Sequence, residues 1–225
     1  MKAAVLHAPG TPLEIQEVGL RKPGPHEVLV RTSFAGLCHS DLHFMEGLYP
    51  HPMPVVLGHE AAGVVEQVGA EVTYLKPGDH VISCLSVFCG TCEMCTSGRP
   101  AVCENTEVKL PPGAARRLEW DRSDQLHTFV NLSAFAEQML VHENALVKIR
   151  KDMPLDRAAV IGCAIVTGFG AVANSAQVKP GETVAVIGCG GVGLAAVNGV
   201  YIAELVVAFD DGRRQRLLRK VAVVR

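Results

Sequence analysis

Four of the eight cysteines of this chain lie together within residues 87–103, in the pattern C-x2-C-x2-C-x7-C. They are Cys89, Cys92, Cys95 and Cys103. Two-residue gaps let a tight loop turn successive sulfur atoms towards one centre, and thiolates suit tetrahedral Zn²⁺. Four protein ligands fill that coordination shell and leave no position for water or substrate. The spacing therefore favours a structural zinc site; an iron–sulfur cluster or two disulfides would also use four cysteines.

Three other residues have metal-binding chemistry, but each is weak evidence by itself. Cys38 lies in GLCHSDLH, His59 in GHEAAG and Cys163 in IGCAIVTG. A single cysteine is usually a small core residue, and a single histidine is more often a hydrogen-bonded polar residue than a ligand. We interpret the two remaining cysteines, Cys84 and Cys189, as ordinary small residues.

A glycine motif near position 190 could bind a dinucleotide. The sequence TVAVIGCGGVG predicts a strand, then the turn Gly188-x-Gly190-x-x-Gly193, then a helix. Such glycines let the backbone approach a pyrophosphate at the helix N-terminus, although a plain tight turn has the same composition. Asp210 follows 22 residues after Gly188, the spacing of an acid that binds the ribose 2′-hydroxyl of NAD. Arg213 and Arg214 could accommodate the additional phosphate of NADP instead.

The elements that must position these residues change in character along the chain. Short runs rich in Val and Ile, separated by Pro-Gly and Gly-Asp turns, predict a β-rich first part: EVLVRTSFAG, AAGVVEQVGA and GDHVISCLSV. Residues 104–127 are polar and charged, which predicts a surface excursion, and FVNLSAFAEQMLVHENALVKI then returns to a strand pattern. We therefore expect one β-rich domain over residues 1–155.

From residue 152 the pattern becomes that of helices alternating with strands. We expect a helix over 152–176, the strands TVAVI, LVVAF and VAVV, and a helical basic stretch before the last of these. Such alternation predicts βαβ units in a parallel sheet, over a second domain at 156–225. Three strands make only one half of a dinucleotide-binding sheet. The exposed sheet edge and uncovered apolar face predict a homo-oligomer or a poorly soluble chain.

Composition excludes some classes of function. The formal net charge is −2 and the pI is about 6.5, so nucleic-acid binding has no electrostatic support. The N-terminal MKAAVLHAPG lacks the apolar stretch of a signal peptide, and we expect no run of about 18 apolar residues to span a membrane. The expected compartment is the cytoplasm, where thiols stay reduced and clustered cysteines indicate metal binding or catalysis.

Together these motifs resemble the zinc-dependent alcohol dehydrogenases of the medium-chain dehydrogenase family. The element CHSDLH, then GHE near position 60, KPGD at 76–79, the four-cysteine lobe at 87–103 and the late glycine motif stand in the order of that family. The resemblance implies an α/β plus β fold, in which a GroES-like β-rich catalytic domain precedes a Rossmann domain. That Rossmann domain would be incomplete, as in a chain truncated at its C-terminal end.

The resemblance also implies two zinc ions per chain. The catalytic ion would be held by Cys38, His59 and Cys163, with water or the substrate oxygen in the fourth position. Such a metal lowers the pKa of a bound alcohol, and the resulting alkoxide expels hydride towards the nicotinamide. The implied reaction is the NAD-linked oxidation of a small alcohol to an aldehyde or ketone.

Family positions assign further roles near these ligands. Ser40 would accept the proton of the alcohol, and His43 would end that proton relay at the surface. Asp41 and Glu60 match acidic positions that orient the ring of His59 or approach the metal. His39 would lie near the pyrophosphate and Thr167 near the nicotinamide.

Two alternatives stay open at this point. Glutathione-dependent formaldehyde dehydrogenases and polyol dehydrogenases share the same metal and nucleotide apparatus. A chain that stops after half of a dinucleotide sheet could instead be a non-catalytic fragment stabilised by zinc.

Overall fold

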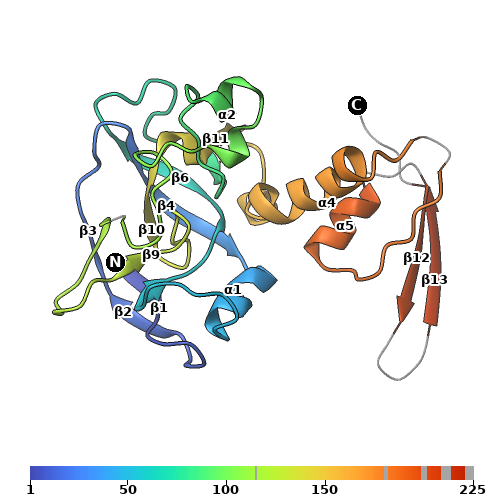
Figure 1. The fold of residues 1–225 in the computed structure, drawn as a ribbon, viewed down its shortest axis with the longest axis horizontal. Coiled ribbons are helices and arrows are strands. Elements are labelled where there is room, and N and C mark those ends of the chain that lie inside the picture. The colour runs from blue at the N-terminus through green and yellow to red at the C-terminus, as the bar shows by residue number, and fades with distance from the viewer. Residues whose placement is uncertain (115, 180–181, 199–201, 209–213, 221–225) are drawn as a thin grey trace. The chain divides into compact units, whose positions relative to one another are not determined.

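The computed structural model describes residues 1–114, 116–179, 182–198, 202–208 and 214–220. The chain divides into two compact units, Met1–Gly162 and Cys163–Arg225. The first unit is built mainly from strands and the second from helices and one strand pair (Figure 1).

A five-stranded antiparallel sheet forms the centre of the first unit. Its strand order is β10-β4-β6-β7-β11, and the strands are β4 (Glu27–Gly36), β6 (Glu60–Val68), β7 (His80–Ser83), β10 (Gln138–His142) and β11 (Leu146–Ile149). Apolar residues alternate along β4, so that Val28 and Val30 are buried. They pack with Met139 and Val141 of β10 in the largest core cluster. The predicted strands EVLVRTSFAG, AAGVVEQVGA and GDHVISCLSV correspond to β4, β6 and β7.

A second sheet has the order β2-β1-β5-β9 and also belongs to the first unit. Its strands are β1 (Lys2–Leu6), β2 (Glu14–Glu17), β5 (Val55–Val56) and β9 (His127–Thr128), and a separate pair joins β3 (Gly19–Leu20) to β8 (Leu118–Glu119). The residues before His59 therefore continue directly from a buried strand of this sheet, β5. This continuity fixes the path of the chain into the GHE motif.

Short helices lie between the strands of the first unit and after its last strand. They are α1 (His39–Met45), α2 (Glu93–Thr96), α3 (Leu155–Ala158) and the 3₁₀ turns η1 (Pro100–Val102) and η2 (Glu143–Ala145). Helix α1 begins three residues after the end of β4, and Cys38 is its N-cap residue. The end of the central sheet thus positions the CHSDLH element.

The predicted surface excursion over 104–127 is anchored more deeply than its composition indicates. Arg117 is 3% exposed, and its Nε donates to a carboxylate oxygen of Glu27 at 2.8 Å. Leu118 and Leu126 are buried in the core that surrounds β1. The ion pair of Arg117 and the two buried leucines therefore anchor residues 104–127 to the rest of the first unit.

The second unit begins within a helical stretch. The helix predicted over 152–176 is observed over residues 155–175, as α3 followed by η3 (Ile161–Ile165), α4 (Val166–Gly170) and η4 (Ala171–Ser175). Helix α5 (Gly191–Asn198) packs against α4, because Gly168 lets the carbonyl of Val192 approach too closely for a Cβ atom.

The helical stretch Leu155–Ser175 corrects one expectation from the sequence. Its mean hydropathy of 1.6 makes it long and apolar enough to cross a membrane, whereas we expected no such run. Its valines and isoleucines, Val160, Ile161, Ile165, Val166 and Val172, contribute most of this mean. A core helix passes the same test of length and composition, and Ala158 lies in a core cluster of the first unit.

The strand pair of the second unit differs from the predicted parallel arrangement. Strand β12 (Ile202–Ala208) contains most of LVVAF, but it pairs antiparallel with β13 (Arg214–Lys220), where the basic stretch was predicted to be helical. A parallel pair needs a crossover of a dozen or more residues, and the link 209–213 is too short for one. Within 182–190, which the structure describes throughout, only Ala185 makes a bridge, so TVAVI is not a strand. The predicted strand VAVV lies outside the described residues.

Candidate metal centres and the adjoining pocket

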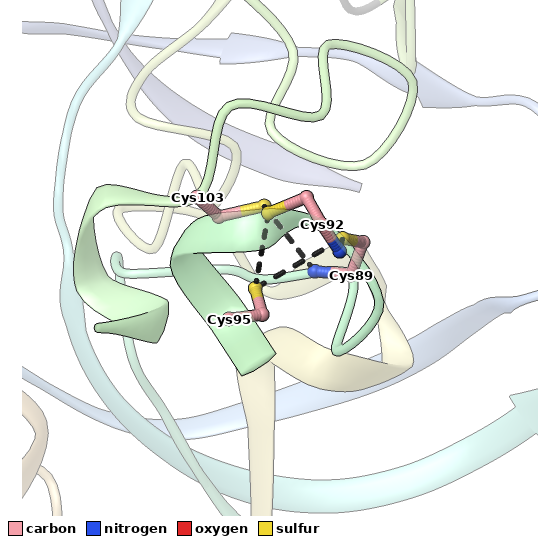
Figure 2. A group of neighbouring side chains, drawn as sticks. All are labelled: Cys89, Cys92, Cys95 and Cys103. Carbon is pink, nitrogen blue, oxygen red and sulfur yellow. Dashed lines mark hydrogen bonds between the residues drawn. The ribbon is translucent and has the colours of Figure 1, made fainter. Parts of the chain in front are cut away.

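The four cysteines of the lobe point towards one another (Figure 2). The Sγ–Sγ distances are 3.5 Å for Cys92–Cys95, 3.8 Å for Cys92–Cys103 and 3.9 Å for Cys89–Cys95. A tetrahedral zinc with Zn–S bonds of about 2.3 Å places its sulfur atoms roughly 3.8 Å apart. A disulfide would need about 2.05 Å. The donor set and its spacing therefore fit a closed tetrahedral metal site.

Local hydrogen bonds prepare the Cys89 sulfur to bind a cation. The backbone N–H groups of Thr91 and Cys92 donate to this sulfur at 3.4 and 3.3 Å, and the Thr91 hydroxyl donates at 3.5 Å. These donors, the Thr91 hydroxyl foremost, lower the pKa of the Cys89 thiol to about 6. Gly90, with φ of +82°, allows the turn that aims the two N–H groups at the sulfur.

A second group of candidate ligands lies at the end of the central sheet. One ligand atom each from Cys38, His59 and Glu60 lies within 4.8 Å of the others. His59 and Glu60 are each 2% exposed, so their polar atoms need partners or a cation. Gly36 packs on the Glu60 carboxylate so closely that a Cβ atom at this position would force the carboxylate to move. Thiolate, imidazole and carboxylate together are donors that suit zinc.

Asp41 orients both segments of this group from within helix α1. Its Oδ2 accepts from the N–H of Cys38 at 3.2 Å, and its Oδ1 accepts from the N–H of Gly58 at 3.2 Å. The same Oδ1 lies 3.1 Å from Nδ1 of His59. A proton on Nδ1 directs the other ring nitrogen, Nε2, to the role of metal ligand. Asp41 itself is only 3% exposed.

The predicted relay residues lie beside this group on helix α1. Ser40 is half-buried, and the ring of His43 lies in an edge-to-face contact with that of His39, with centroids 4.8 Å apart. The rings of Tyr49 and His43 are also in edge-to-face contact, with centroids 5.5 Å apart. The predicted ligand Cys163 is the first residue of the second unit.

The glycine motif forms a turn before helix α5. Gly188 has φ of +102°, and Gly193 lies so close to the carbonyl of Gly188 that a Cβ atom would not fit. A Cβ atom at Gly188 or Gly190 would meet no other atom within 4 Å, so this side of the turn leaves room for a ligand. Thr167 lies exposed on α4. The predicted ribose-binding Asp210 and the neighbouring Arg213 lie outside the described residues.

The sequence did not predict a pocket that lies in the first unit near His59. Its volume is about 270 Å³. It is lined mainly by apolar side chains from α1, from the segments after it and from loops of the excursion: Phe44, Pro50, His51, Leu85, Lys109, Leu110, Pro111, Pro112, Thr128, Val130 and Asn131. These residues are far apart in sequence and share no spacing, so no sequence signal marked them.

One aromatic ring links the pocket wall to the metal-ligand group. The ring of Phe129 lies 5.9 Å from that of His59. It also contacts the pocket-lining rings of Phe44, at 4.7 Å, and His51, at 5.5 Å. Phe129 therefore contacts both His59 and two of the residues that line the pocket.

Comparison with known proteins shows which family this chain resembles. Residues 24–151 match the family model of the alcohol dehydrogenase GroES-like domain. "Putative alcohol dehydrogenase D" of Mycobacterium tuberculosis is 40% identical over 213 residues, which are 92% of this chain and 58% of that protein. The S-(hydroxymethyl)glutathione dehydrogenase of Escherichia coli O1:K1 is 42% identical over 221 residues, which are 95% of this chain and 60% of that enzyme.

Solved structures show the same likeness. An alcohol dehydrogenase zinc-binding domain protein from Burkholderia ambifaria matches with a TM-score of 0.80 and 42% identity, over 88% of this chain and 55% of that one. Benzyl alcohol dehydrogenase from Acinetobacter calcoaceticus matches with a TM-score of 0.80 and 36% identity, over 90% and 57%.

The chain spans less than two thirds of the length of these relatives. The family model nevertheless covers more than half of the chain, and its span contains the four-cysteine lobe, Cys38, His59 and Glu60. The predicted α/β plus β fold with a GroES-like domain is thereby confirmed. On this evidence the chain belongs to the zinc-type alcohol dehydrogenase family, and its residues 24–151 form the GroES-like domain of that family.

Proposed function

We propose that this chain carries the catalytic centre of a zinc-dependent alcohol dehydrogenase that oxidises a small alcohol to an aldehyde or ketone with NAD. The observation that carries the proposal is the convergence of Cys38, His59 and Glu60 on one point, with Asp41 hydrogen-bonded to both of their segments. A buried group of this kind is typical of a site that holds a metal with an open position.

Cys163 is the proposed third protein ligand of this zinc. It directly follows Gly162, which packs so closely against the carbonyl of Ser83 in the first unit that a Cβ atom would not fit. Ser83 in turn accepts from the backbone N–H of Ala61, two residues after His59. These contacts hold the backbone of Gly162, the residue that precedes Cys163, within the first unit.

When bound, zinc would lower the pKa of the alcohol hydroxyl towards neutrality. Ser40 would accept the hydroxyl proton, and His43 would carry it towards solvent, since a histidine titrates near neutral pH. Glu60 and Asp41 would hold the ligand set in place. The four cysteines of the lobe would hold a second zinc that only stabilises the fold.

The proposed cofactor would accept the hydride of the alcohol. The turn at Gly188 and Gly190, together with Gly193 in the first turn of helix α5, would hold its pyrophosphate at a helix N-terminus. His39 would contact the pyrophosphate and Thr167 the nicotinamide. We propose NAD rather than NADP on the position of Asp210 in the sequence. We also propose that the protein functions as a homo-oligomer in the cytoplasm.

Counting zinc tests the proposal directly. The chain purified with zinc should contain two ions, and Cys38→Ala should contain one, because the lobe keeps its own four ligands. Cys84→Ala is the matched control and should keep two. Retention of both ions by Cys38→Ala, measured by metal analysis, would contradict the proposed catalytic centre.

A second candidate activity acts on a glutathione adduct. It is favoured by the 42% identity to S-(hydroxymethyl)glutathione dehydrogenase. Comparing NADH formation from simple alcohols and from S-(hydroxymethyl)glutathione separates the two activities. A zinc-loaded, folded chain that forms NADH from neither would instead be a non-catalytic, metal-stabilised protein.

A further inference from the structure

One histidine of the first unit lies between two carboxylates. His26 directly precedes β4, and its Nδ1 lies 2.8 Å from a carboxylate oxygen of Glu143. Its Nε2 lies 2.8 Å from a carboxylate oxygen of Glu71. Ionised carboxylates only accept hydrogen bonds, so both ring nitrogens donate. A neutral imidazole has one N–H group, and the arrangement therefore requires the charged form of His26.

The charged ring joins two other turns to the beginning of β4. Glu71 lies in the turn after β6, and Glu143 begins η2, between β10 and β11. Backbone bonds follow the same path: the N–H of Glu71 donates to the carbonyl of Pro25 at 3.0 Å, and that of Glu143 donates to the carbonyl of His26 at 2.9 Å. We call the two contacts of the ring, with Glu71 and Glu143, the His26 bridge.

The other titratable groups near the ring do not compete for its charge. The ring of His142 stacks on that of His26, with centroids 5.9 Å apart, and its Nδ1 accepts from the N–H of Asn144 at 3.1 Å. Burial foremost lowers the pKa of His142, so this ring stays neutral. The carboxylate of Glu27, next in sequence, is paired with Arg117.

The turn η2 fixes the segment that enters the four-cysteine lobe. The side-chain amide of Asn144 donates to the carbonyl of Phe88 at 2.7 Å. The N–H of Cys84 donates to the carbonyl of Ala145 at 2.8 Å. Phe88 directly precedes Cys89, the first cysteine of the lobe (Figure 2). Two residues of η2 thus hold both ends of the short segment that leads to the first thiolate.

The turn after β6 is connected to η2 a second time. The hydroxyl of Tyr74 lies 2.7 Å from the carbonyl oxygens of Glu143 and Leu146 and donates its proton between them. These two residues begin η2 and directly follow it. A displacement of the turn after β6 therefore reaches η2 through Tyr74 as well as through the His26 bridge.

Loss of one proton from His26 opens the bridge on the side of Glu71. A deprotonated ring nitrogen and a carboxylate oxygen are both acceptors, and they repel each other at 2.8 Å. The side chain of Glu71 is 62% exposed and can turn into water, whereas that of Glu143 is 11% exposed. The remaining proton therefore stays on Nδ1, facing Glu143, and Glu71 is released.

We propose that the His26 bridge is a pH-sensitive switch, which holds η2 in place and thereby slows the loss of the metal ion from the four-cysteine lobe. The inference goes beyond the proposed function and rests on one part of it, zinc binding by the lobe. The hydrogen bond with Glu143 foremost raises the pKa of His26 above its ordinary value. The bridge is therefore fully closed below the unfolded pKa of about 6.5 and opens as the pH rises through the raised folded pKa.

The test measures zinc loss to EDTA from the full chain carrying Cys38→Ala, which breaks the other ligand group. The release rate after adding His26→Gln is divided by that of the Cys38→Ala parent, so that protonation of the thiolates cancels. The ratio should be about two- to fivefold at pH 6, the effect of losing a partly exposed ion pair, and should fall to one at pH 9. Metal analysis of desalted samples gives the rates.

Three further variants, each in the Cys38→Ala chain, test the path of the effect. Glu71→Gln opens the bridge from its exposed side and should reproduce the ratio at pH 6. Asn144→Ala should release zinc faster at both pH values, and adding His26→Gln to it should cause no further change, because the bond to Phe88 is already lost. His7→Gln is the matched control, at a histidine in another ion pair of the first unit, and should give a ratio of one.

A ratio of one for His26→Gln at pH 6 overturns the inference. Equal ratios above one at pH 6 and pH 9 also overturn it, since the role of His26 would then be structural alone. The same holds if His26→Gln keeps its effect in the Asn144→Ala chain. A lobe that holds no zinc contradicts that part of the proposed function together with the inference, whereas a zinc-loaded lobe with a ratio of one contradicts the inference alone.

Discussion

At the scale of single residues, Asp41 joins the two segments that supply the candidate catalytic ligands. One buried carboxylate accepts from the backbone of Cys38 and of Gly58 and faces the ring of His59. Helix capping and orientation of a ligand are thus performed by the same side chain. The resemblance implied the orienting role alone; its combination with helix capping depends on the approach of residues 17 and 18 positions apart.

Replacing Asp41 with asparagine should weaken zinc binding at the catalytic centre. Asparagine keeps the size of the side chain but loses the charge that favours a protonated Nδ1 on His59. We expect about a 10–100-fold loss of zinc affinity at this centre, the usual effect of changing a partner of a metal-binding histidine. Competition with a chromophoric chelator measures it. Asp152→Asn, at an exposed ion pair, is the control, and equal affinity in the two variants would contradict the role of Asp41.

At the scale of elements, the buried ion pair between Glu27 and Arg117 joins β4 to the excursion. Burial opposes the ionisation of Glu27, but the N–H of Gly24 and the guanidinium of Arg117 outweigh it and lower the pKa of this carboxyl. A carboxyl with a lowered pKa in the folded state stabilises that state at pH values above its unfolded pKa. This contribution is lost as the pH falls through the folded pKa.

Protonation of Glu27 at acid pH should therefore contribute to the destabilisation of the first unit. We expect the free energy of unfolding to fall as the pH drops below about 4.5, where the unfolded carboxyl begins to bind protons. Glu27→Gln should remove part of this pH dependence and cost about 3 kcal/mol at neutral pH, because it leaves Arg117 buried without its anion. Denaturant titrations across pH measure both effects. If the exposed Glu17→Gln flattens the acid limb as much as Glu27→Gln does, the assignment to the buried pair is wrong.

Local sequence patterns predicted some of the elements correctly and others wrongly. The alternation of EVLVRTSFAG predicted β4, and the spacing of the cysteines predicted the lobe, because both depend on neighbours in sequence. The basic stretch has near-helical spacing, yet it forms β13, because the short link after β12 imposes an antiparallel partner. The pocket escaped prediction since Phe44, Leu85 and Val130 meet only through tertiary packing.

At the scale of the whole molecule, the second unit exposes a group of large apolar side chains. On α4 and α5 the exposed fractions are 53% for Val166, 53% for Phe169, 44% for Val192 and 49% for Leu194. Exposed apolar groups of this kind promote association.

We expect the purified chain to associate through the second unit. Sedimentation equilibrium should show a mass that rises with concentration, and Phe169→Ser should shift this rise to higher concentration because it removes exposed apolar area. Ile15→Ser, at a residue 69% exposed in the first unit, is the control and should leave the association unchanged. A monodisperse monomer at all concentrations would refute the expectation.

The close spacing of Cys38, Asp41, His59 and Glu60 along the chain has a consequence for synthesis on the ribosome. All four fall within residues 38–60, so the loop that joins them is short and costs little entropy to close. Domains generally fold from their N-terminal end as the chain emerges. The ligands from the first unit and their positioning carboxylate can therefore meet while the second unit is still being translated.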